Sequence, residues 1–413
     1  MHATVVRPFV VGLLLASLVV AGCASTEDSA GNDESSDITP APTAPLPPGE
    51  PIPLMINFTS EGVDANPQIV EGAQAAAQAI NNEGGIQDRP IEIIPCDNHN
   101  DPNLAAECGR QAVEEGAVAS VGDLTQQSTE YLPIYEQNQI AALGNSPANV
   151  ASFTSPASFP ITGGAVSNFA GLGRYVADAG ATKVAVVRPD IGPAAIALTL
   201  VEAGAAPVGA TVVNDIAVPA DAPDMASYAA AALDGGADGI VLALGSQQAI
   251  NFIQAVRQTD PEVTIGFVAS SLDEVIDALG PGAEGLLLAE FLIPPDVETE
   301  GTAEYRQEMT DAGFEEVGAL RNTAWLSVHV FADVAADLPE ITNTTVFDAL
   351  GGVEGLDSPL TPPIQFTNGG VFDLPRVFTG CTYATTLDAD GVATPVTGTF
   401  FDPFTDAECE TPS

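Results

Sequence analysis

The segment GVDANPQIVEGAQAAAQAINNEGGIQDRPIEIIPCDNHNDPNLAAECGRQAVEEGAVASVG (Gly62–Gly122) alternates between two hydrophobic periods, and this alternation decides the fold class. Apolar residues at helical spacing stop before Gly84 and Gly85, which supply the backbone freedom that ends a helix. Short apolar runs of strand length separate the helical stretches. The pattern therefore predicts helix, strand, helix and strand over Pro67–Asn81, Ile91–Pro95, Asn103–Glu115 and Ala117–Val121.

The same alternation continues on both sides of this segment. A buried strand is expected at Ile52–Phe58, then, after the segment, a helix at Thr129–Gln137 and a strand at Ile140–Leu143. The alternation resumes beyond a Pro-, Ser- and Gly-rich stretch at Ser152–Gly164. It predicts helices at Val166–Ala179, Ala194–Ala203, Met225–Leu233 and Gln248–Gln258, and strands at Lys183–Val187, Thr211–Ile216, Gly239–Leu244 and Thr264–Val268. Repeats of this kind form parallel sheets with helices on both faces, and ligands bind beyond the carboxyl ends of the strands.

The last third of the chain changes character. An apolar run at Leu286–Leu292 is followed by helical patterns at Thr302–Ala312 and Leu320–Ala336. From Ile364 onward the chain is richer in Thr, Gly and Phe, which favours extended strands joined by turns.

The amino terminus predicts export. Residues 1–22 combine a basic start with an uncharged apolar run of 13 residues, Phe9–Ala21, which is shorter than the ~20 residues that span a bilayer and therefore predicts a signal peptide. The small residues before Cys23 resemble the lipobox of bacterial lipoproteins, in which the cysteine is lipidated. Residues 23–50 are acidic and Pro-rich, so we expect a disordered tether after the lipidated Cys23.

The charge balance limits the partners. The chain has 56 acidic and 10 basic residues, a formal charge of −46, which excludes nucleic acid as a partner because that binding needs cationic contacts with phosphate. The same charge disfavours strongly anionic ligands and raises solubility, and it is compatible with a saline habitat. The folded part, about Pro51–Ser413, is too long for one typical core and fits two lobes.

Four cysteines remain besides Cys23. An even number in an exported chain predicts disulfides, and the pairing that closes the shortest loops is Cys96–Cys108 and Cys381–Cys409. Neither pair has the C-x₂-C spacing of a zinc site and the three histidines are scattered, so we expect no metal.

Several features of the quoted segment resemble the opening of type I periplasmic binding proteins, in particular the branched-chain amino acid (Leu/Ile/Val) group. They are the helix end Ala79-Ile80-Asn81 with Gly84-Gly85-Ile86, the strand that leads to Asp97, the helix start Asp101-Pro102, and Val121-Gly122. Val218–Leu244 and Gly280–Gly285 extend the resemblance, which covers Pro51 to about Pro375.

The resemblance implies an α/β fold of two Rossmann-like lobes with parallel sheets, joined by a hinge that the chain crosses three times. Lobe one would comprise residues 51–165 and 298–374, and lobe two residues 166–296 and 375–413. Each expected disulfide then lies within a single lobe and leaves the hinge free to close on a ligand.

Two loops of lobe one, together with Asn66 in its first loop, are candidate ligand sites. Gly122–Ser128 follows a strand and opens a helix, where free N–H groups favour an anion, and in the family this loop contacts the ligand. The alternative is an ordinary helix N-cap. The loop Gly144–Ala148 contributes backbone and hydroxyl contacts in the family, although it also fits a simple proline turn. The candidate contacts are Asn66, Gln126, Gln127, Ser128, Asn145, Ser146 and Ala148.

Lobe two offers Ile191, Ser246, Ser270 and Ser271, each after a predicted strand. The family usually has an aromatic residue where Ile191 stands, and an acid that holds an α-ammonium group near Ser270 and Ser271, so both contacts are altered. Arg188 is expected to pair with Asp190 or to meet a ligand acid.

The resemblance implies an extracytoplasmic substrate-binding lipoprotein of an ABC importer, anchored to the outer face of the cell membrane through Cys23. It would capture a small polar solute (an amino acid, amide or related metabolite) by hinge closure, deliver it to the transporter permease, and need no cofactor. A sensor or adhesive lipoprotein of the same fold that acts with a separate partner is the alternative. An enzyme is disfavoured because the chain lacks G-x-S-x-G, H-E-x-x-H and Walker motifs and a usable Cys/His pair.

Overall fold

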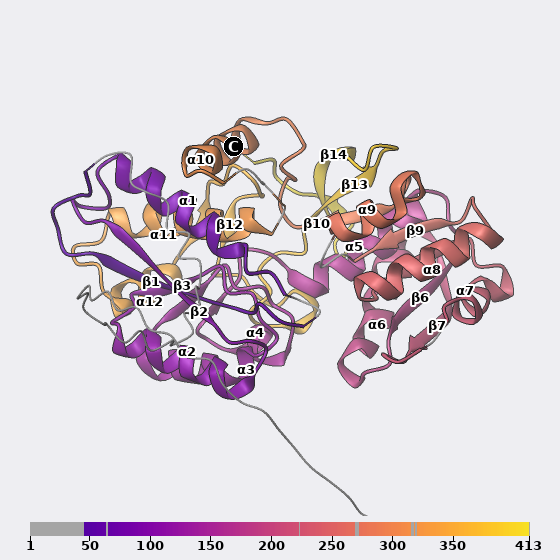
Figure 1. Cartoon of the computed structure of the whole chain (residues 1–413), viewed down its shortest axis with the longest axis horizontal. Coiled ribbons are helices and arrows are strands. Elements are labelled where there is room, and N and C mark those ends of the chain that lie inside the picture. The colour runs from indigo at the N-terminus through magenta and orange to yellow at the C-terminus, as the bar shows by residue number, and fades with distance from the viewer. Residues whose placement is uncertain are drawn as a thin grey trace, which may run out of the picture. The chain divides into compact units, whose positions relative to one another are not determined.

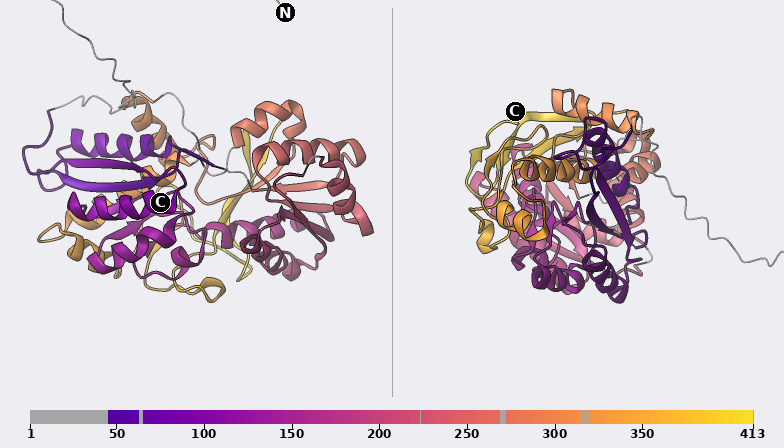
Figure 2. Two further views of the ribbon diagram at one scale, coloured as in Figure 1. Left: turned by 60° about the horizontal axis from the view of Figure 1, so that its bottom comes forward. Right: turned by 90° about the vertical axis from the view of Figure 1, so that its left-hand side faces the viewer.

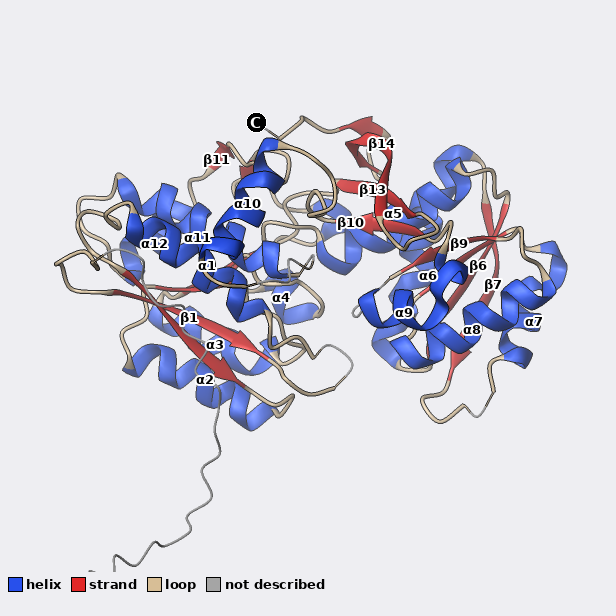
Figure 3. Cartoon of the chain, turned by 45° about the horizontal axis from the view of Figure 1, so that its top comes forward, coloured by secondary structure: helices blue, strands red, loops and turns tan. Residues whose placement is uncertain are grey.

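The computed structural model describes residues 45–62, 65–222, 224–268, 272–314, 318 and 320–412. The predicted signal peptide, Cys23 and most of the predicted tether lie outside the described residues. Two larger sheets organise the described chain, and each carries helices on both faces (Figure 1, Figure 3).

Sheet one has five parallel strands in the order β2-β1-β3-β4-β5. The strands are β1 (Ile52–Phe58), β2 (Ile91–Asp97), β3 (Ala119–Val121), β4 (Ala141–Leu143) and β5 (Ser158–Phe159). The connecting helices are α1 (Ile69–Asn82), α2 (Pro102–Glu114), α3 (Ser128–Asn138) and α4 (Val150–Thr154). Because the strands are parallel, all five carboxyl ends meet at one edge of the sheet.

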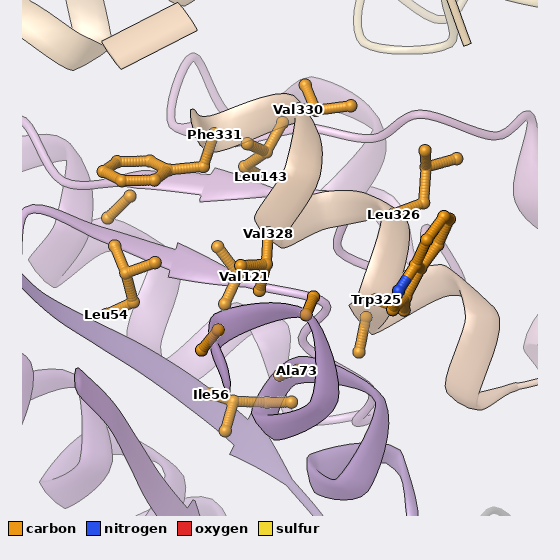
Figure 4. Close-up of a cluster of buried hydrophobic side chains, with 14 of the residues drawn as sticks. Leu54, Ile56, Ala73, Val121, Leu143, Trp325, Leu326, Val328, Val330 and Phe331 are labelled. Atoms are coloured by element: carbon orange, nitrogen blue, oxygen red, sulfur yellow. The ribbon is translucent and has the colours of Figure 1, made fainter. Parts of the chain in front are cut away.

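The core of this half includes helices from much later in the chain. α10 (Glu300–Asp311), α11 (Arg321–Ala336) and α12 (Asn343–Leu350) follow sheet two in sequence and return to sheet one, where the later segments lie beside the first strands (Figure 2). Ile56 of β1, Val121 of β3 and Trp325 of α11 belong to one buried hydrophobic cluster (Figure 4). Full burial of each large side chain contributes about 1.5–3 kcal/mol, so these contacts hold the returning helices on the sheet.

Sheet two has eight strands in the order β15-β14-β13-β10-β9-β8-β6-β7. They are β6 (Lys183–Pro189), β7 (Thr211–Val218), β8 (Gly239–Leu242), β9 (Thr264–Phe267), β10 (Leu287–Glu290), β13 (Thr382–Leu387), β14 (Ala393–Asp402) and β15 (Ala407–Glu408). Its helices are α5 (Gly164–Asp178), α6 (Ile196–Ala205), α7 (Ala226–Leu233), α8 (Ser246–Thr259) and α9 (Leu272–Leu279).

The predicted fold class is confirmed, with one difference in sheet two. β6, β7, β8, β9 and β10 run parallel to one another, whereas the pairs β10–β13, β13–β14 and β14–β15 are antiparallel, so this sheet is mixed rather than parallel. Short connections explain the pairs β13–β14 and β14–β15, because only a crossover of a dozen or more residues can return a chain to a parallel strand. The chain passes between the two sheets three times, after β5, after β10 and before β13.

Some elements were not predicted. The Pro-, Ser- and Gly-rich stretch Ser152–Gly164 contains the end of α4 and the two-residue strand β5, and β11 (Glu354–Leu356) lies before the tail and pairs with β12 (Ile364–Gln365), the start of the predicted extended region. α9 and α12 were also missed. These elements are short, and their positions are fixed by packing on larger neighbours rather than by a long periodic pattern.

Both predicted disulfides are present. Cys96 at the end of β2 is bonded to Cys108 on α2, and Cys381 is bonded to Cys409. In the part of the chain that the structure describes, no helix combines the length and hydrophobicity needed to cross a membrane.

Candidate functional site

The carboxyl edge of sheet one gathers the loops that the sequence singled out. The turn that begins at Thr59 follows β1, Gly122–Gln127 follows β3 and leads into α3, and Gly144–Asn149 follows β4 and leads into α4. Hydrogen bonds join the last two: the amide of Ser146 donates to the carbonyl of Asp123 at 2.9 Å, and the Asn149 side chain donates to the carbonyl of Gln126 at 2.9 Å. The two loops therefore form one surface.

The predicted anion site at the start of α3 is largely occupied by the protein's own groups. The amide of Gln127 donates to the hydroxyl oxygen of Thr125 at 3.1 Å, and the buried Ser128 hydroxyl donates to Asn149 Oδ1 at 2.8 Å. The Gln127 side chain donates to Asn100 Oδ1 at 2.9 Å. Gln127 and Ser128 thus hold neighbouring loops together, and in this structure the Gln127 amide and the Ser128 hydroxyl already have partners within the protein.

Asn145 is also a structural residue in this structure. Its side chain is buried, donates to Ser158 Oγ at 2.9 Å and accepts from the same hydroxyl at 3.2 Å. It therefore fixes β4 against β5. The amide of Ala148 donates to Ser152 Oγ at 3.1 Å, within a capping box that begins α4.

Other predicted groups stay accessible or unpartnered on this edge. Gln126 is exposed, and Ser146 and Ala148 are half-buried. Asn66 is half-buried too, and its Oδ1 is shielded from solvent with no hydrogen-bond partner among the described residues. An unpartnered buried carbonyl oxygen costs about 1–3 kcal/mol, which a donor from a solute or a water molecule would relieve.

A buried polar network underlies these loops. Asn98 donates from Nδ2 to Asn57 Oδ1 at 2.7 Å and to Thr125 Oγ1 at 3.0 Å. The Asp123 carboxylate accepts the amide of Asn57 at 2.8 Å. Burial raises the pKa of Asp123 to about 6, while hydrogen bonds from Ser120 and from the Asn57 amide oppose that rise. The network connects the ends of β1, β2 and β3, which positions the loops that follow them.

Fewer of the candidate residues on the second sheet lie in the described part of the chain. Arg188 forms a two-pronged ion pair with Asp215 of β7, with Nε–Oδ1 at 2.8 Å and Nη2–Oδ2 at 2.6 Å. The structural ion pair was predicted, but the expected partner Asp190 was wrong, because neighbouring parallel strands bring Asp215 beside Arg188. The hydrogen bonds that Arg188 donates to Asp215 raise the pKa of Arg188.

Ile191 and Ser246 lie where their strands end. Ile191 is 58% exposed, so its apolar side chain is accessible. Ser246 is half-buried at the first position of α8. Ser270 and Ser271 lie outside the described residues.

A cavity of about 280 Å³ is lined by other parts of the chain than the candidate loops. It is lined by Pro160, Ile161, Thr361, Pro362, Pro363, Ile364, Gln365, Phe378, Thr379, Cys381, Asp402, Thr405, Ala407, Glu408, Cys409 and Glu410, so it contains none of the predicted ligand residues. Among the described residues, no three His, Cys, Asp or Glu side chains gather in a way that would hold a metal ion.

Sequence reasoning missed Asn57, Asn98, Asp123, Asn149 and Ser158, which build the edge from within. One signal was present: Asn57 interrupts the apolar run IPLMINF, and a polar residue in a buried strand must find a partner. The partners themselves come from other strands and could not be named without the topology.

Comparisons with known proteins agree on the fold. The structure is similar to the branched-chain amino acid binding protein LivJ of Streptococcus pneumoniae in complex with isoleucine, at a TM-score of 0.68 and 18% identity, covering 84% of this chain and 99% of that one. It is similar to a fatty acid ABC transporter substrate-binding protein of Thermomonospora curvata, at a TM-score of 0.71 and 18% identity, covering 88% of this chain and 95% of that one.

A third similar structure is a solute-binding protein of R. palustris in complex with 4-hydroxybenzoate, at a TM-score of 0.69 and 15% identity, covering 84% of this chain and 96% of that one. A comparison of the sequence with curated proteins gave no match. A family model described as periplasmic binding protein matches residues 51–391, which is most of the chain. The chain therefore belongs to the periplasmic binding protein family.

Proposed function

We propose that this protein is the substrate-binding component of an ABC importer and captures a small polar solute between the carboxyl edges of its two sheets. Lobe one is taken as residues 51–165 and 298–374, and lobe two as residues 166–296 and 375–413. Closure of the lobes removes the solute from water, and the closed form delivers it to the permease.

The observation that carries the proposal is the linked pair of loops after β3 and β4 in a chain of this family. The hydrogen bonds between the loops fix Gln126, Ser146 and Ala148 on a common surface, and Asn66 adds an unpartnered buried acceptor. Preorganised polar groups of this kind lose little conformational freedom on binding, which favours affinity.

The chemistry of the edge favours an uncharged or zwitterionic solute. Apart from the methyl group of Ala148, the exposed and half-buried candidate side chains of lobe one are amides and hydroxyls, and Arg188 of lobe two is already paired with Asp215. The formal charge of −46 repels strong anions. We propose direct contacts from Asn66, Gln126, Ser146, Ala148, Ile191 and Ser246, with Ser270 and Ser271 as further candidates.

Export and anchoring complete the proposal. The apolar run that ends before Cys23 supports a signal peptide and lipid attachment at that cysteine, and the acidic, Pro-rich residues 23–50 support a spacer between the membrane and the folded part.

The test is a thermal-denaturation screen of the purified protein against L-amino acids, amides, urea derivatives and 4-hydroxybenzoate. A true ligand at 100 times its dissociation constant stabilises the folded state by ~2.7 kcal/mol. Ser146→Ala should weaken this stabilisation, because it removes a hydroxyl from the ligand surface. The matched control Ser227→Ala, on the exposed face of α7, should leave it unchanged. If the solute stabilises both variants equally, it does not bind at the Ser146 hydroxyl, and the proposed lobe-one site is wrong.

A further inference from the structure

Asp123 occupies the junction of the two loops after β3 and β4. Its Oδ1 accepts the amide of Asn57 at 2.8 Å and the Ser120 hydroxyl at 2.5 Å, so the side chain joins β1 to β3. Its main-chain carbonyl accepts the Ser146 amide at 2.9 Å, so the backbone joins β3 to the loop after β4. One residue therefore connects three parallel strands at the edge where the solute is proposed to bind.

No cation among the described residues balances the carboxylate. Asp123 is 2% exposed, and its second oxygen, Oδ2, has no hydrogen-bond partner among the described residues. Of the titratable groups on α3, the phenols of Tyr131 and Tyr135 face it, and burial with the neighbouring carboxylate raises the pKa of each phenol well above its usual value, so both stay neutral. β1 and β3 contribute an amide and a hydroxyl. A buried carboxylate without a counter-charge destabilises the folded state.

Asparagine would make the same acceptor contacts at lower cost. It has nearly the shape of aspartate and an oxygen in the place of Oδ1, but it carries no charge into the core. The presence of a charged group where a neutral one would be more stable is typical of functional positions.

We propose that the ionised Asp123 carboxylate is a positioning group that clamps the Gly122–Ser128 and Gly144–Ala148 loops in their solute-binding arrangement, and that its protonation loosens them. The effect of this protonation on solute binding rests on the proposed function. The clamp itself does not, because it acts between loops of the free protein.

The direction of the pH dependence follows from chemistry. Charge-assisted hydrogen bonds are stronger than neutral ones, so protonation weakens the bonds to the Asn57 amide and to Ser120. Burial raises the pKa of Asp123 to about 6, which places the change between mildly acidic and neutral solution. The raised pKa also means that the folded state gains stability from the protonated form below the ordinary value of 3.8, and loses it as the pH rises through about 6.

The first experiment measures amide hydrogen exchange in the ligand-free protein at pH 5 and pH 8, corrected for intrinsic rates. In the wild type, protection of the Asn57 amide should fall by about fivefold at pH 5, the effect of exchanging a charged for a neutral hydrogen bond. Protection of the Ser146 amide, which bonds the main-chain carbonyl of Asp123, should fall as well because the loop that carries this carbonyl loosens. Asp123→Asn should show weak protection at both pH values. The control Asp277→Asn, an exposed carboxyl on α9, should behave as the wild type.

Stability provides a second measurement on the same variants. Asp123→Asn should be more stable than the wild type at pH 8, where the buried charge is fully present, and this advantage should shrink at pH 5. A residue that only packs in the core would be destabilised by the change at both pH values. Wild-type protection of Ser146 that is independent of pH would overturn the clamp without any variant.

A third experiment repeats the thermal-denaturation screen with L-leucine, propionamide and urea at both pH values. A probe that stabilises the wild type should do so less in Asp123→Asn at pH 8. Equal stabilisation of both proteins would contradict the positioning role. If no probe stabilises the wild type, the proposed function fails for these solutes. The hydrogen-exchange measurement still tests whether Asp123 holds the two loops.

Discussion

At the scale of single residues, Arg376, one of 10 basic residues, stabilises the junction between the two sheets. Arg376 donates from Nε to the Ser158 carbonyl at 2.6 Å, and its guanidinium lies 4.4 Å and 4.7 Å from the ring centroids of Phe159 and Phe378. Burial lowers the pKa of Arg376 to about 10, so the group stays charged at neutral pH. It thereby ties the segment before β13 to the end of β5, next to two of the three passages between the sheets.

Replacement of Arg376 by leucine should lower the free energy of unfolding by ~1–3 kcal/mol, because the Ser158 carbonyl loses a donor and the two rings lose a cation. The free energy of unfolding of Arg376→Lys should lie between those of the wild type and the leucine variant, since lysine keeps the charge but not the planar stacking group. Urea denaturation measures both. The matched control is Arg110→Leu, an exposed arginine on α2, and an equal loss in that variant would refute the role of the stacked guanidinium.

The predicted site residues show what a linear sequence reveals about single side chains. Their positions after strands were predictable, since βα alternation places strand ends on one edge. Their partners were not: Asn145 bonds to Ser158 and Ser128 bonds to Asn149, across turns whose geometry no periodicity describes. The candidates that stay accessible, such as Gln126 and Ser146, are therefore the better tests of binding.

At the scale of elements, small residues set the distance between α5 and α6. A Cβ at Gly204 of α6 would overlap the carbonyl oxygen of Ala170 on α5, and a Cβ at Gly173 of α5 would overlap the carbonyl oxygen of Val201 on α6. The helices therefore approach backbone to backbone, which only glycine permits.

Gly204→Ala should destabilise the protein by ~1–3 kcal/mol, the usual cost of forcing an extra carbon into a packed interface. The control Gly282→Ala adds the same methyl group where it meets only an ordinary contact with Leu279. Thermal or urea denaturation distinguishes the two. A Gly204→Ala variant as stable as the control would show that the helices separate without cost.

Long elements with a clear period were predictable, and short ones were not. The helices and strands of the Gly62–Gly122 segment lie within a few residues of their predicted ends, because each has its own apolar stripe or run. β5 and α4 are held by neighbours rather than by pattern. β13, β14 and β15 pair antiparallel because the connections between them are short. The composition of the tail predicted strands there, but it did not predict which strands pair.

At the scale of the whole molecule, charge is the dominant feature. The chain carries 56 acidic and 10 basic residues, so most carboxylates have no cation to pair with. Their mutual repulsion opposes the compact state at neutral pH, and added salt screens it over a Debye length of about 10 Å at 0.1 M and about 3 Å at 1 M.

The melting temperature should therefore rise as NaCl increases from 0.05 to 1 M. Each ~1 kcal/mol of relieved repulsion corresponds to roughly 2–4 °C in domains of 150–250 residues. Differential scanning calorimetry checks this, with sorbitol at equal osmolality as the uncharged control. A melting temperature that falls with salt would show that attractive ion pairs outweigh the repulsion.

The central claim is that two hinged units close on a solute held at their strand ends. Small-angle X-ray scattering with and without the solute that stabilises most strongly in the thermal screen tests it most directly. The account predicts a smaller radius of gyration in the bound protein, and a smaller response in Ser146→Ala at the same solute concentration. An unchanged radius of gyration at saturating solute would contradict it.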